Sequence, residues 1–474
     1  MPRKDAEPPV PDIANEFVGA DFGDARLEVR LVDIGLLLAE SPTESLPRAT
    51  GTKRDLEGTY RFLNNDAVRP LKVLAPHFAQ TCQRIAAYET VLVLHDTTEF
   101  QYSGDREGLG YLRTDEARGY LAHASLAVSA DGLRRPLGLV GLHTWARKGL
   151  APKARARGKK KSGALLASER TKESDRWSRQ VEASEDVVGN HAHVVHVMDR
   201  EGDSYPLLAS MVAKGRRFVI RSRVDRIARS EDEAGLEKIR EIVKREDDLV
   251  ELDVPISMRA VTKGPSRHPP RGSRVAKLRV TATALSLHKP EYGVDLPMWL
   301  DVNVVHVREV DAPDGVPVDW LLLTSEPVDT LEQVLAILQH YRARWLIEEF
   351  FKALKTGCEL EKLQLESYEA LVNALAVFIP IAWRALQMRS LARTEPNGPA
   401  RSVLSNAELD VLRAMGPLKL PASPTIADAL LAVAMMGGYM RHRVPPGWMT
   451  LARGFDKLLL LTAGWIARES SGDF

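Results

Sequence analysis

The segment 341–355 places one carboxylate, one phenol and several cations at helical spacing. On an α-helix each residue advances by roughly 100°, so one narrow face would carry Tyr341, Arg344, Glu348, Lys352 and Lys355. The opposite face would carry only apolar residues, namely Ala343, Leu346, Ile347, Phe350 and Leu354. Trp345 would lie at the edge of the polar face. This polar face could belong to an active site, but an exposed helix with ion pairs along its surface gives the same pattern. Acidic residues elsewhere in the sequence must decide between these two interpretations.

Two further acids are expected at the ends of short apolar strands. Asp96 follows the run 91–95, and Asp199 follows the run 194–198. Two acids at strand ends and one on a later helix are typical of sites that transfer phosphoryl groups with two divalent cations roughly 4 Å apart. We expect Asp96 to bridge both metals, Asp199 to complete one metal site and Glu348 to complete the other. Carboxylate oxygens favour Mg²⁺, and Mn²⁺ is expected to substitute.

Composition removes several other classes of function. The formal net charge is +1, so a polyanionic partner must be held by local basic patches. Two cysteines, Cys82 and Cys358, form neither a disulfide framework nor a metal-binding spacing. The group His191, His193 and His196 does not predict zinc, because alternation in a strand places His196 on the opposite face from the other two.

The amino-terminal region is expected to be helical and basic. Residues 1–12 contain four prolines and predict a flexible lead-in. Amphipathic patterns over 24–38 and 51–63 predict two helices of a small DNA-reading module. Its cations would contact phosphates: Arg26, Arg30, Lys53 and Arg61. Each of these side chains could equally be a solvated surface residue.

The middle of the chain alternates between strands and helices. After a helix over 71–88, a short strand from Val91 that ends at Asp96 and the runs 120–128 and 136–144 predict three consecutive strands. The lysine- and arginine-rich segment 151–180 predicts a mobile basic loop, and a second basic loop is expected near 263–274. Strand-like segments over about 225–320 predict an inserted antiparallel subdomain. Apolar runs beyond residue 368 predict a helical carboxy-terminal region, and the stripe within 448–467 could form a core or a dimer contact.

Several sequence blocks then identify a family. The spacing Tyr341, Arg344, Glu348, Lys355 matches the Tyr-(2)-Arg-(3)-Glu-(6)-Lys signature of bacterial cut-and-paste transposases of the insertion-sequence-four family, and the chain resembles its transposon-five type. Further matching blocks start at Asp96 (Asp-Thr-Thr), Gly141 (Gly-Leu-His), Asp199 (Asp-Arg-Glu), Phe218 (Phe-Val-Ile-Arg-Ser) and Trp320 (Trp-Leu-Leu-Leu-Thr-Ser-Glu-Pro-Val), with Gly23-Asp-x-Arg and Tyr60-Arg-Phe near the amino terminus. The resemblance covers almost the whole chain.

The resemblance implies an α/β multidomain protein with a ribonuclease-H-like catalytic core, interrupted by the antiparallel β insertion at about 225–320. A helical DNA-end-binding domain would span 1–70, the catalytic domain 71–370 and a helical dimerisation domain 371–474. In this family one active site nicks the transposon end, and the freed 3′-hydroxyl forms a DNA hairpin. Water reopens the hairpin, and the 3′-hydroxyl joins target DNA. Each step is an in-line displacement at phosphorus that the acids Asp96, Asp199 and Glu348 would support with two Mg²⁺ ions.

The same resemblance assigns the DNA contacts. Trp320 would stack on a base flipped out of the hairpin, and Trp345 would help to expel it. Tyr341, Arg344 and Lys355 would hold adjacent phosphates, and Arg221 and Lys352 would also contact DNA. Trp320 could instead be an ordinary core residue on a strand.

A homodimer holding two transposon ends in a synaptic complex is therefore expected, with terminal inverted repeats and target DNA as partners and no membrane. We expect a bacterial cytoplasmic protein that associates with the nucleoid when bound to DNA. Two alternatives stay open: a catalytically silent end-binding repressor of transposition, and a structure-specific ribonuclease-H-like nuclease.

Overall fold

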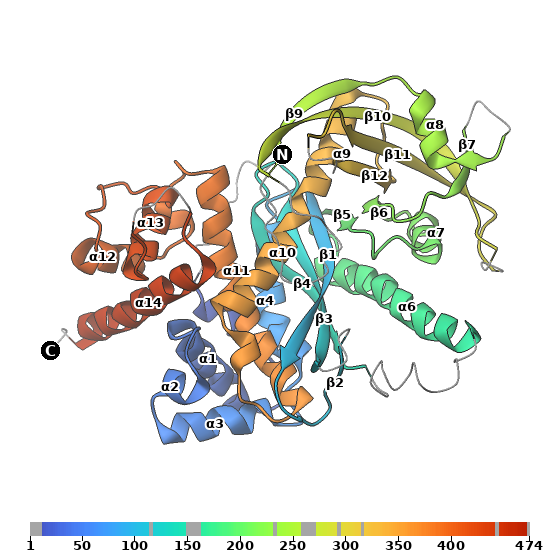
Figure 1. Ribbon diagram of the computed structural model, residues 1–474. Coiled ribbons are helices and arrows are strands. Elements are labelled where there is room, and N and C mark those ends of the chain that lie inside the picture. Colours follow the sequence, from blue (N-terminus) through green and yellow to red (C-terminus); the bar gives the residue numbers. More distant parts are fainter. Residues whose placement is uncertain are drawn as a thin grey trace. The chain divides into compact units, whose positions relative to one another are not determined.

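The computed structural model describes residues 12–112, 117–147, 163–230, 235–256, 272–291, 295–313, 317–440 and 445–471. The chain forms two compact units (Figure 1). Unit 1 contains residues 1–166, 182–193 and 345–474, and unit 2 contains residues 167–181 and 194–344. The predicted lead-in over 1–12 lies almost wholly outside the described residues.

Unit 1 contains the three consecutive strands that the sequence predicted. Strands β1 (Thr90–Tyr102), β3 (Arg118–Ser129) and β4 (Pro136–Trp145) form an antiparallel sheet in which β3 lies between the other two. A short strand, β2 (Gly110–Tyr111), pairs with the start of β3. A side chain at Gly119 would meet the Phe100 carbonyl oxygen at 1.9 Å, so the backbones of β1 and β3 approach closely only because this residue is glycine.

Helices at the amino terminus of unit 1 also follow the prediction. Each of the two predicted helices in the DNA-reading module begins directly after a capping residue whose side chain accepts a backbone N–H, Asp24 for α1 and Thr52 for α3. The apolar stripe Leu31, Ile34 and Leu38 is buried. The elements in this part are η1 (Ala14–Glu16), α1 (Ala25–Glu40), α2 (Leu46–Thr50), α3 (Lys53–Leu63) and α4 (Pro70–Ile85).

The carboxy-terminal part of unit 1 is helical, as predicted: α11 (Tyr368–Thr394), η4 (Ala400–Ser402), α12 (Asn406–Met415), α13 (Ile426–Met436) and α14 (Trp448–Ser471). Leu412, Val433 and Leu458 join a buried cluster that holds the last three helices together. Among the described helices, α11 alone is long and apolar enough to cross a membrane, but 94% of its apolar window is buried. The Trp383 indole nitrogen donates to the Pro136 carbonyl at 3.1 Å, so α11 is a core helix packed on β4.

Unit 2 contains a mixed sheet. Within β5 (His193–Met198) the residues from Val194 belong to this unit, and they run parallel to β6 (Arg217–Arg221). The sheet then continues antiparallel through β12 (Asp319–Thr324), β11 (Trp299–Glu309) and β10 (Arg274–His288). Three shorter strands extend it: β7 (Ile227–Ser230), β8 (Glu237–Lys238) and β9 (Val250–Ile256). The segment 225–320 thus contributes antiparallel strands, and β12 pairs directly with β6.

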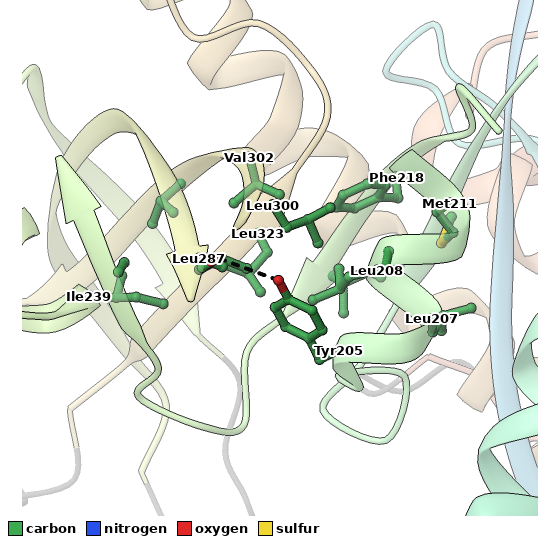
Figure 2. Close-up of a cluster of buried hydrophobic side chains, with 14 of the residues drawn as sticks. Tyr205, Leu207, Leu208, Met211, Phe218, Ile239, Leu287, Leu300, Val302 and Leu323 are labelled. Carbon is green, nitrogen blue, oxygen red and sulfur yellow. Dashed lines mark hydrogen bonds between the residues drawn. The ribbon is translucent and has the colours of Figure 1, made fainter. Parts of the chain in front are cut away.

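Helices α7 (Tyr205–Ala213) and α8 (Ile239–Arg245) supply apolar side chains to the core of unit 2. Leu208 and Met211 of α7 and Ile239 of α8 belong to the same buried cluster as Leu287, Leu300 and Leu323 of the strands (Figure 2). Tyr205 is fully buried there, and its hydroxyl donates to the Pro297 carbonyl at 2.9 Å.

The structure corrects two sequence predictions in this region. The basic residues of 151–180 predict a loop, but residues from Gly163 form helix α6 (Gly163–Val188). The lysines and arginines at 153–161 lie outside the described residues, as does most of the second basic loop at 263–274. Helix formation is understandable, because 163–188 contains four glutamates, three alanines and three arginines and no proline.

The prediction of one continuous helix over 341–355 is also wrong. Helix α9 (Leu331–Ala343) ends before Arg344, α10 (Trp345–Lys352) begins after it, and residues Ala353–Gly357 form a π-helix. Since Arg344 is the last residue of unit 2 and Trp345 opens the third segment of unit 1, the motif is divided between the two units. The predicted apolar side is largely correct, because Ala343, Ile347, Phe350 and Leu354 are buried.

Candidate active site

Asp96 lies in the middle of β1, not at its end. Strand β1 continues to Tyr102 because it stays paired with β3, where Asp96 faces Ala124. The apolar run stops at His95, but the following residues include threonine, phenylalanine and tyrosine, which favour strands. The half-buried Asp96 carboxylate accepts the Thr97 backbone N–H at 2.8 Å, which fixes one oxygen, Oδ1.

A row of polar side chains, buried apart from the half-buried Thr97, lies next to Asp96 along β1 and β3. The Thr97 hydroxyl is 2.9 Å from His123 Nδ1, and His95 Nδ1 is 3.1 Å from the Ser125 hydroxyl. Burial, with the neighbouring His143, lowers the pKa of His123 to about 3, so this imidazole is neutral. Sequence reasoning missed this row, although polar residues recurring inside two otherwise apolar strands were a usable signal.

Glu348 lies in the first turn of α10, and α10 packs against β1. Its helix is anchored by the buried side chains of Ile347 and Phe350, while Glu348 itself is half-buried. Unit 1 therefore holds two of the three predicted acids, Asp96 and Glu348, on elements in contact.

The cations after Glu348 are not arranged as one helical face. Lys355 lies in the π-helical turn, where its ammonium donates to the Glu99 carbonyl oxygen at 2.5 Å. Burial lowers the pKa of Lys355, while Glu361 and Glu99 oppose that shift. Lys352 instead pairs with Glu349 at 2.9 Å and lies over the indole of Trp345, which is 51% exposed.

Asp199 directly follows β5, as predicted, in unit 2. Its Oδ1 accepts the Glu201 backbone N–H at 2.8 Å, and its carbonyl accepts the Gly202 N–H at 3.1 Å, so a tight turn fixes the side chain. Asp199 is half-buried and lies within electrostatic range of the buried Tyr341.

Tyr341 gathers several of the other predicted residues in unit 2. The Trp320 ring packs edge-on against it with 5.2 Å between centroids. Burial raises the pKa of Tyr341, and this shift is opposed by the charges of Arg221 and Arg344 and by a hydrogen bond from Arg221. An acid, two aromatic rings and two guanidinium groups therefore meet on one side of unit 2.

The four predicted phosphate contacts near the amino terminus are on helices α1 and α3. Arg26, Lys53 and Arg61 are exposed, and Arg30 is half-buried. Each has an acidic neighbour: Arg26 pairs with Asp24, Arg30 with Asp55, and both Lys53 and Arg61 with Glu57.

The predicted metal ligands offer only carboxylate oxygens, which suit a hard divalent cation. Asp96 and Glu348 are in unit 1 and Asp199 is in unit 2. Among the described residues, no three His, Cys, Asp or Glu side chains are grouped so that they could hold a metal ion. What supports a divalent metal here is therefore the chemistry of the ligands: all three half-buried side chains offer carboxylate oxygens.

Comparison with protein families gives two matches. Residues 13–68 match a family described as transposase DNA-binding, and residues 163–379 match a family described as transposase DDE domain. The second match includes Asp199 and Glu348 but begins after Asp96. The chain therefore carries the two domains of a DDE transposase, a transposase DNA-binding domain and a transposase DDE domain.

Proposed function

We propose that the chain is a transposase of the insertion-sequence-four family, of the transposon-five type. It nicks transposon ends, excises the element through a DNA hairpin and joins the 3′-hydroxyl ends to target DNA. The observation that carries this proposal is that the two predicted acids of unit 1 lie on packed elements. Asp96 is on β1 and Glu348 is on α10, which packs against it. If α10 were only an exposed helix with surface ion pairs, packing of α10 against the strand that carries Asp96 would not be expected.

Asp96, Asp199 and Glu348 are the proposed catalytic residues and metal ligands. Two divalent cations, Mg²⁺ with Mn²⁺ as a substitute, would stabilise the attacking and leaving oxygens of each displacement. The Thr97 N–H on Asp96 and the Glu201 N–H on Asp199 orient these carboxylates. The protein thereby prepares both acids before any ligand arrives.

The aromatic and basic residues near the acids are proposed to hold the bent DNA. Trp320 is only partly buried, so one face of its indole can stack on a flipped base while its edge rests against Tyr341. Arg221 and Arg344 would bind phosphates beside Tyr341. In unit 1, the exposed Trp345 would displace the base, and Lys352 and Lys355 would contact the backbone.

The remaining regions are proposed to provide specificity and assembly. Residues 1–70 would recognise the terminal inverted repeat through Arg26, Arg30, Lys53 and Arg61. The segment 225–320 would be an insertion into a ribonuclease-H-like core within 71–370, and residues 371–474 would dimerise in the synaptic complex. Exposed apolar side chains on α14, including Leu460 at 63% and Ile466 at 48%, support the dimer contact.

The test is a cleavage assay. The protein would be incubated with Mg²⁺ and a duplex end selected by binding, and the products would be separated on a denaturing gel. Hairpinned ends without flanking DNA are expected. Binding without any nick would instead support a silent repressor, and nicks without hairpins or strand transfer would support a structure-specific nuclease.

A variant pair sharpens this test. Glu348→Gln should abolish nicking and retain end binding, because it removes the carboxylate but keeps the shape of the side chain. Glu332→Gln, at an exposed glutamate in the first turn of α9, is the matched control and should nick normally. Persistent nicking by Glu348→Gln would show that the acid assignment is wrong.

A further inference from the structure

We infer that Arg200 and Arg240 bind backbone phosphates of the DNA next to Trp320, and that Asp319 positions Arg240 for this contact. The inference rests on the proposed function, since it extends the phosphate contacts assigned to Arg221 and Arg344. All of these residues belong to unit 2.

Asp319 is the first residue of β12 and directly precedes Trp320. Its carboxylate accepts two hydrogen bonds from Arg240 of helix α8, at 3.0 Å to Oδ1 and 2.9 Å to Oδ2. His306 Nε2 of β11 is 3.0 Å from the same Oδ1. The Asp319 carbonyl accepts Arg221 Nη2 of β6 at 2.9 Å. One residue therefore gathers two guanidinium groups from different elements beside Trp320.

Arg200 adds a third guanidinium group to this cluster. It follows Asp199, is exposed, and lies within electrostatic range of Arg221, Arg240 and Asp319. Within the described part of the chain, Arg200 forms no hydrogen bond or ion pair. Two carboxylates that are not proposed metal ligands lie beside these cations: Asp319 on the Arg240 guanidinium, and Asp225, whose Oδ1 accepts the Arg240 backbone N–H at 3.1 Å. Three guanidinium groups beside these two carboxylates leave an excess of positive charge.

Mutual repulsion makes such a cluster unfavourable unless an anion occupies it. Guanidinium groups match phosphate oxygens in charge and planar hydrogen-bonding geometry. The neighbouring Trp320 is proposed to stack on a base of the DNA, so the anions expected here are successive phosphates of one strand.

A purely structural role explains the cluster less well. The side chains of Arg240 and Asp319 are 35% and 39% exposed, and exposed ion pairs add little to stability. The exposure does allow the outer N–H groups of Arg240 to reach a ligand. Asp319 would hold the guanidinium in place and thereby reduce the entropy lost when DNA binds.

The experiment measures DNA binding in Ca²⁺, without cleavage, at NaCl concentrations from about 50 to 200 mM. The probes are a duplex end selected by binding and a scrambled duplex of equal length. Arg200→Gln and Arg240→Gln should each weaken binding to both probes by about five- to tenfold and lower the salt slope by about one. The Lys variants should keep the slope, because they keep the charge.

Arg413→Gln is the matched control, since Arg413 on α12 is 40% exposed and pairs with Asp410. It should leave affinity and slope unchanged. Asp319→Asn tests positioning, because loss of a negative charge alone would tighten DNA binding, whereas loss of the Arg240 clamp weakens it. Circular dichroism and the melting temperature of each variant check folding.

Unchanged salt slopes for both Gln variants would overturn the proposed phosphate contacts of Arg200 and Arg240. Tighter DNA binding by Asp319→Asn would overturn the positioning role of Asp319. These outcomes are separate from failure of the proposed function, in which the wild-type protein binds ends but does not nick them in Mg²⁺. A wild-type protein that binds neither probe would overturn both.

Discussion

A buried charge cluster in unit 1 allows a quantitative prediction about stability. Glu16 is 2% exposed, and its carboxylate receives hydrogen bonds from two residues of α4: His77 Nδ1 at 2.5 Å and Arg84 Nη1 at 2.7 Å. Arg84 also donates to the Leu137 carbonyl at 2.5 Å and lies 4.0 Å from the Trp383 ring centroid. Glu16 belongs to the matched DNA-binding segment, so this cluster ties that segment to β4 and α11.

The protonation state of His77 follows from its partners. The Leu139 backbone N–H donates to His77 Nε2 at 3.0 Å, so that nitrogen carries no proton and Nδ1 must donate to Glu16. Burial lowers the pKa of His77, against the opposing charge of Glu16. Burial also opposes ionisation of Glu16, but His77 and Arg84 outweigh it and lower the pKa of this carboxylate.

Glu16→Gln should therefore destabilise unit 1 by about 2–4 kcal/mol at pH 7. Removing one partner from a buried charge pair costs about 3–5 kcal/mol, and the remaining amide oxygen can still accept one hydrogen bond. Glu57→Gln is the matched control in the same matched segment. Its exposed pairs with Lys53 and Arg61 should contribute no more than about 1 kcal/mol.

Acidification should remove the same stabilisation. The folded pKa of Glu16 lies below 4.5 and that of His77 below 6.5, so the unfolded chain binds both protons first as the pH falls. The His77 contribution is lost below about pH 6.5, and the Glu16 contribution is lost below about pH 4.5. The difference in unfolding free energy between wild type and Glu16→Gln should therefore shrink at low pH.

Guanidinium denaturation gives the free energy of unfolding, and hydrogen exchange at the Leu139 amide reports the cluster locally. Glu16→Gln should speed exchange at Leu139, and Glu57→Gln should not. A loss below about 1 kcal/mol at pH 7, with unchanged Leu139 protection, would refute this account of the cluster.

Three further predictions concern other sites. Burial raises the pKa of Asp456 to about 7, so the folded protein binds a proton at this carboxyl more readily than the unfolded chain, and stability is lost as the pH rises from about 4 to 7. In the same denaturation assay, Asp456→Asn should stabilise the protein by about 1–2 kcal/mol at pH 8 and by less at pH 5. Equal effects at both pH values would contradict the assignment. The Cys358 thiol is buried, and burial raises its pKa. In a Cys82→Ser variant, a thiol reagent at pH 8 should therefore label Cys358 only after denaturation. Rapid labelling of the native protein would show that this part of the core is open. Trp320→Ala should impair hairpin formation more than the first nick, and Trp320→Phe should restore part of the hairpin signal on a denaturing gel; equal loss of both steps would indicate a folding role.

Sequence patterns predicted the elements well where local chemistry decides the structure. Asp24 and Thr52 are capping residues in front of amphipathic runs, and helices α1 and α3 begin directly after them. Asp199 follows a short apolar run bounded by a turn, and strand β5 ends directly before it. In these cases the decisive interactions lie within a few residues of each other.

Predictions were less accurate where distant residues decide the structure. The end of the apolar run at His95 predicts a strand end at Asp96, but pairing with β3 extends β1 to Tyr102. The row from Thr97 to His95 depends on residues 26 to 30 positions away, His123 and Ser125. No local periodicity reports such a pairing. Helix α6 is the opposite case, because its composition favoured a helix and the lysines preceding it suggested a loop.

The break at Arg344 changes how the signature motif must be understood. No glycine or proline occurs between Tyr341 and Lys355, so periodicity carried one helical face across the whole segment. Tyr341 and Glu348 nevertheless lie on different helices, and their spacing in sequence does not fix their relative geometry. The role of Tyr341 must be argued from its contacts with Trp320 and Arg221, and that of Glu348 from the packing of α10 on β1. Each half of the motif thus owes its orientation to the unit that contains it, so the role of each residue is tested by its own variant and not by its position in the signature.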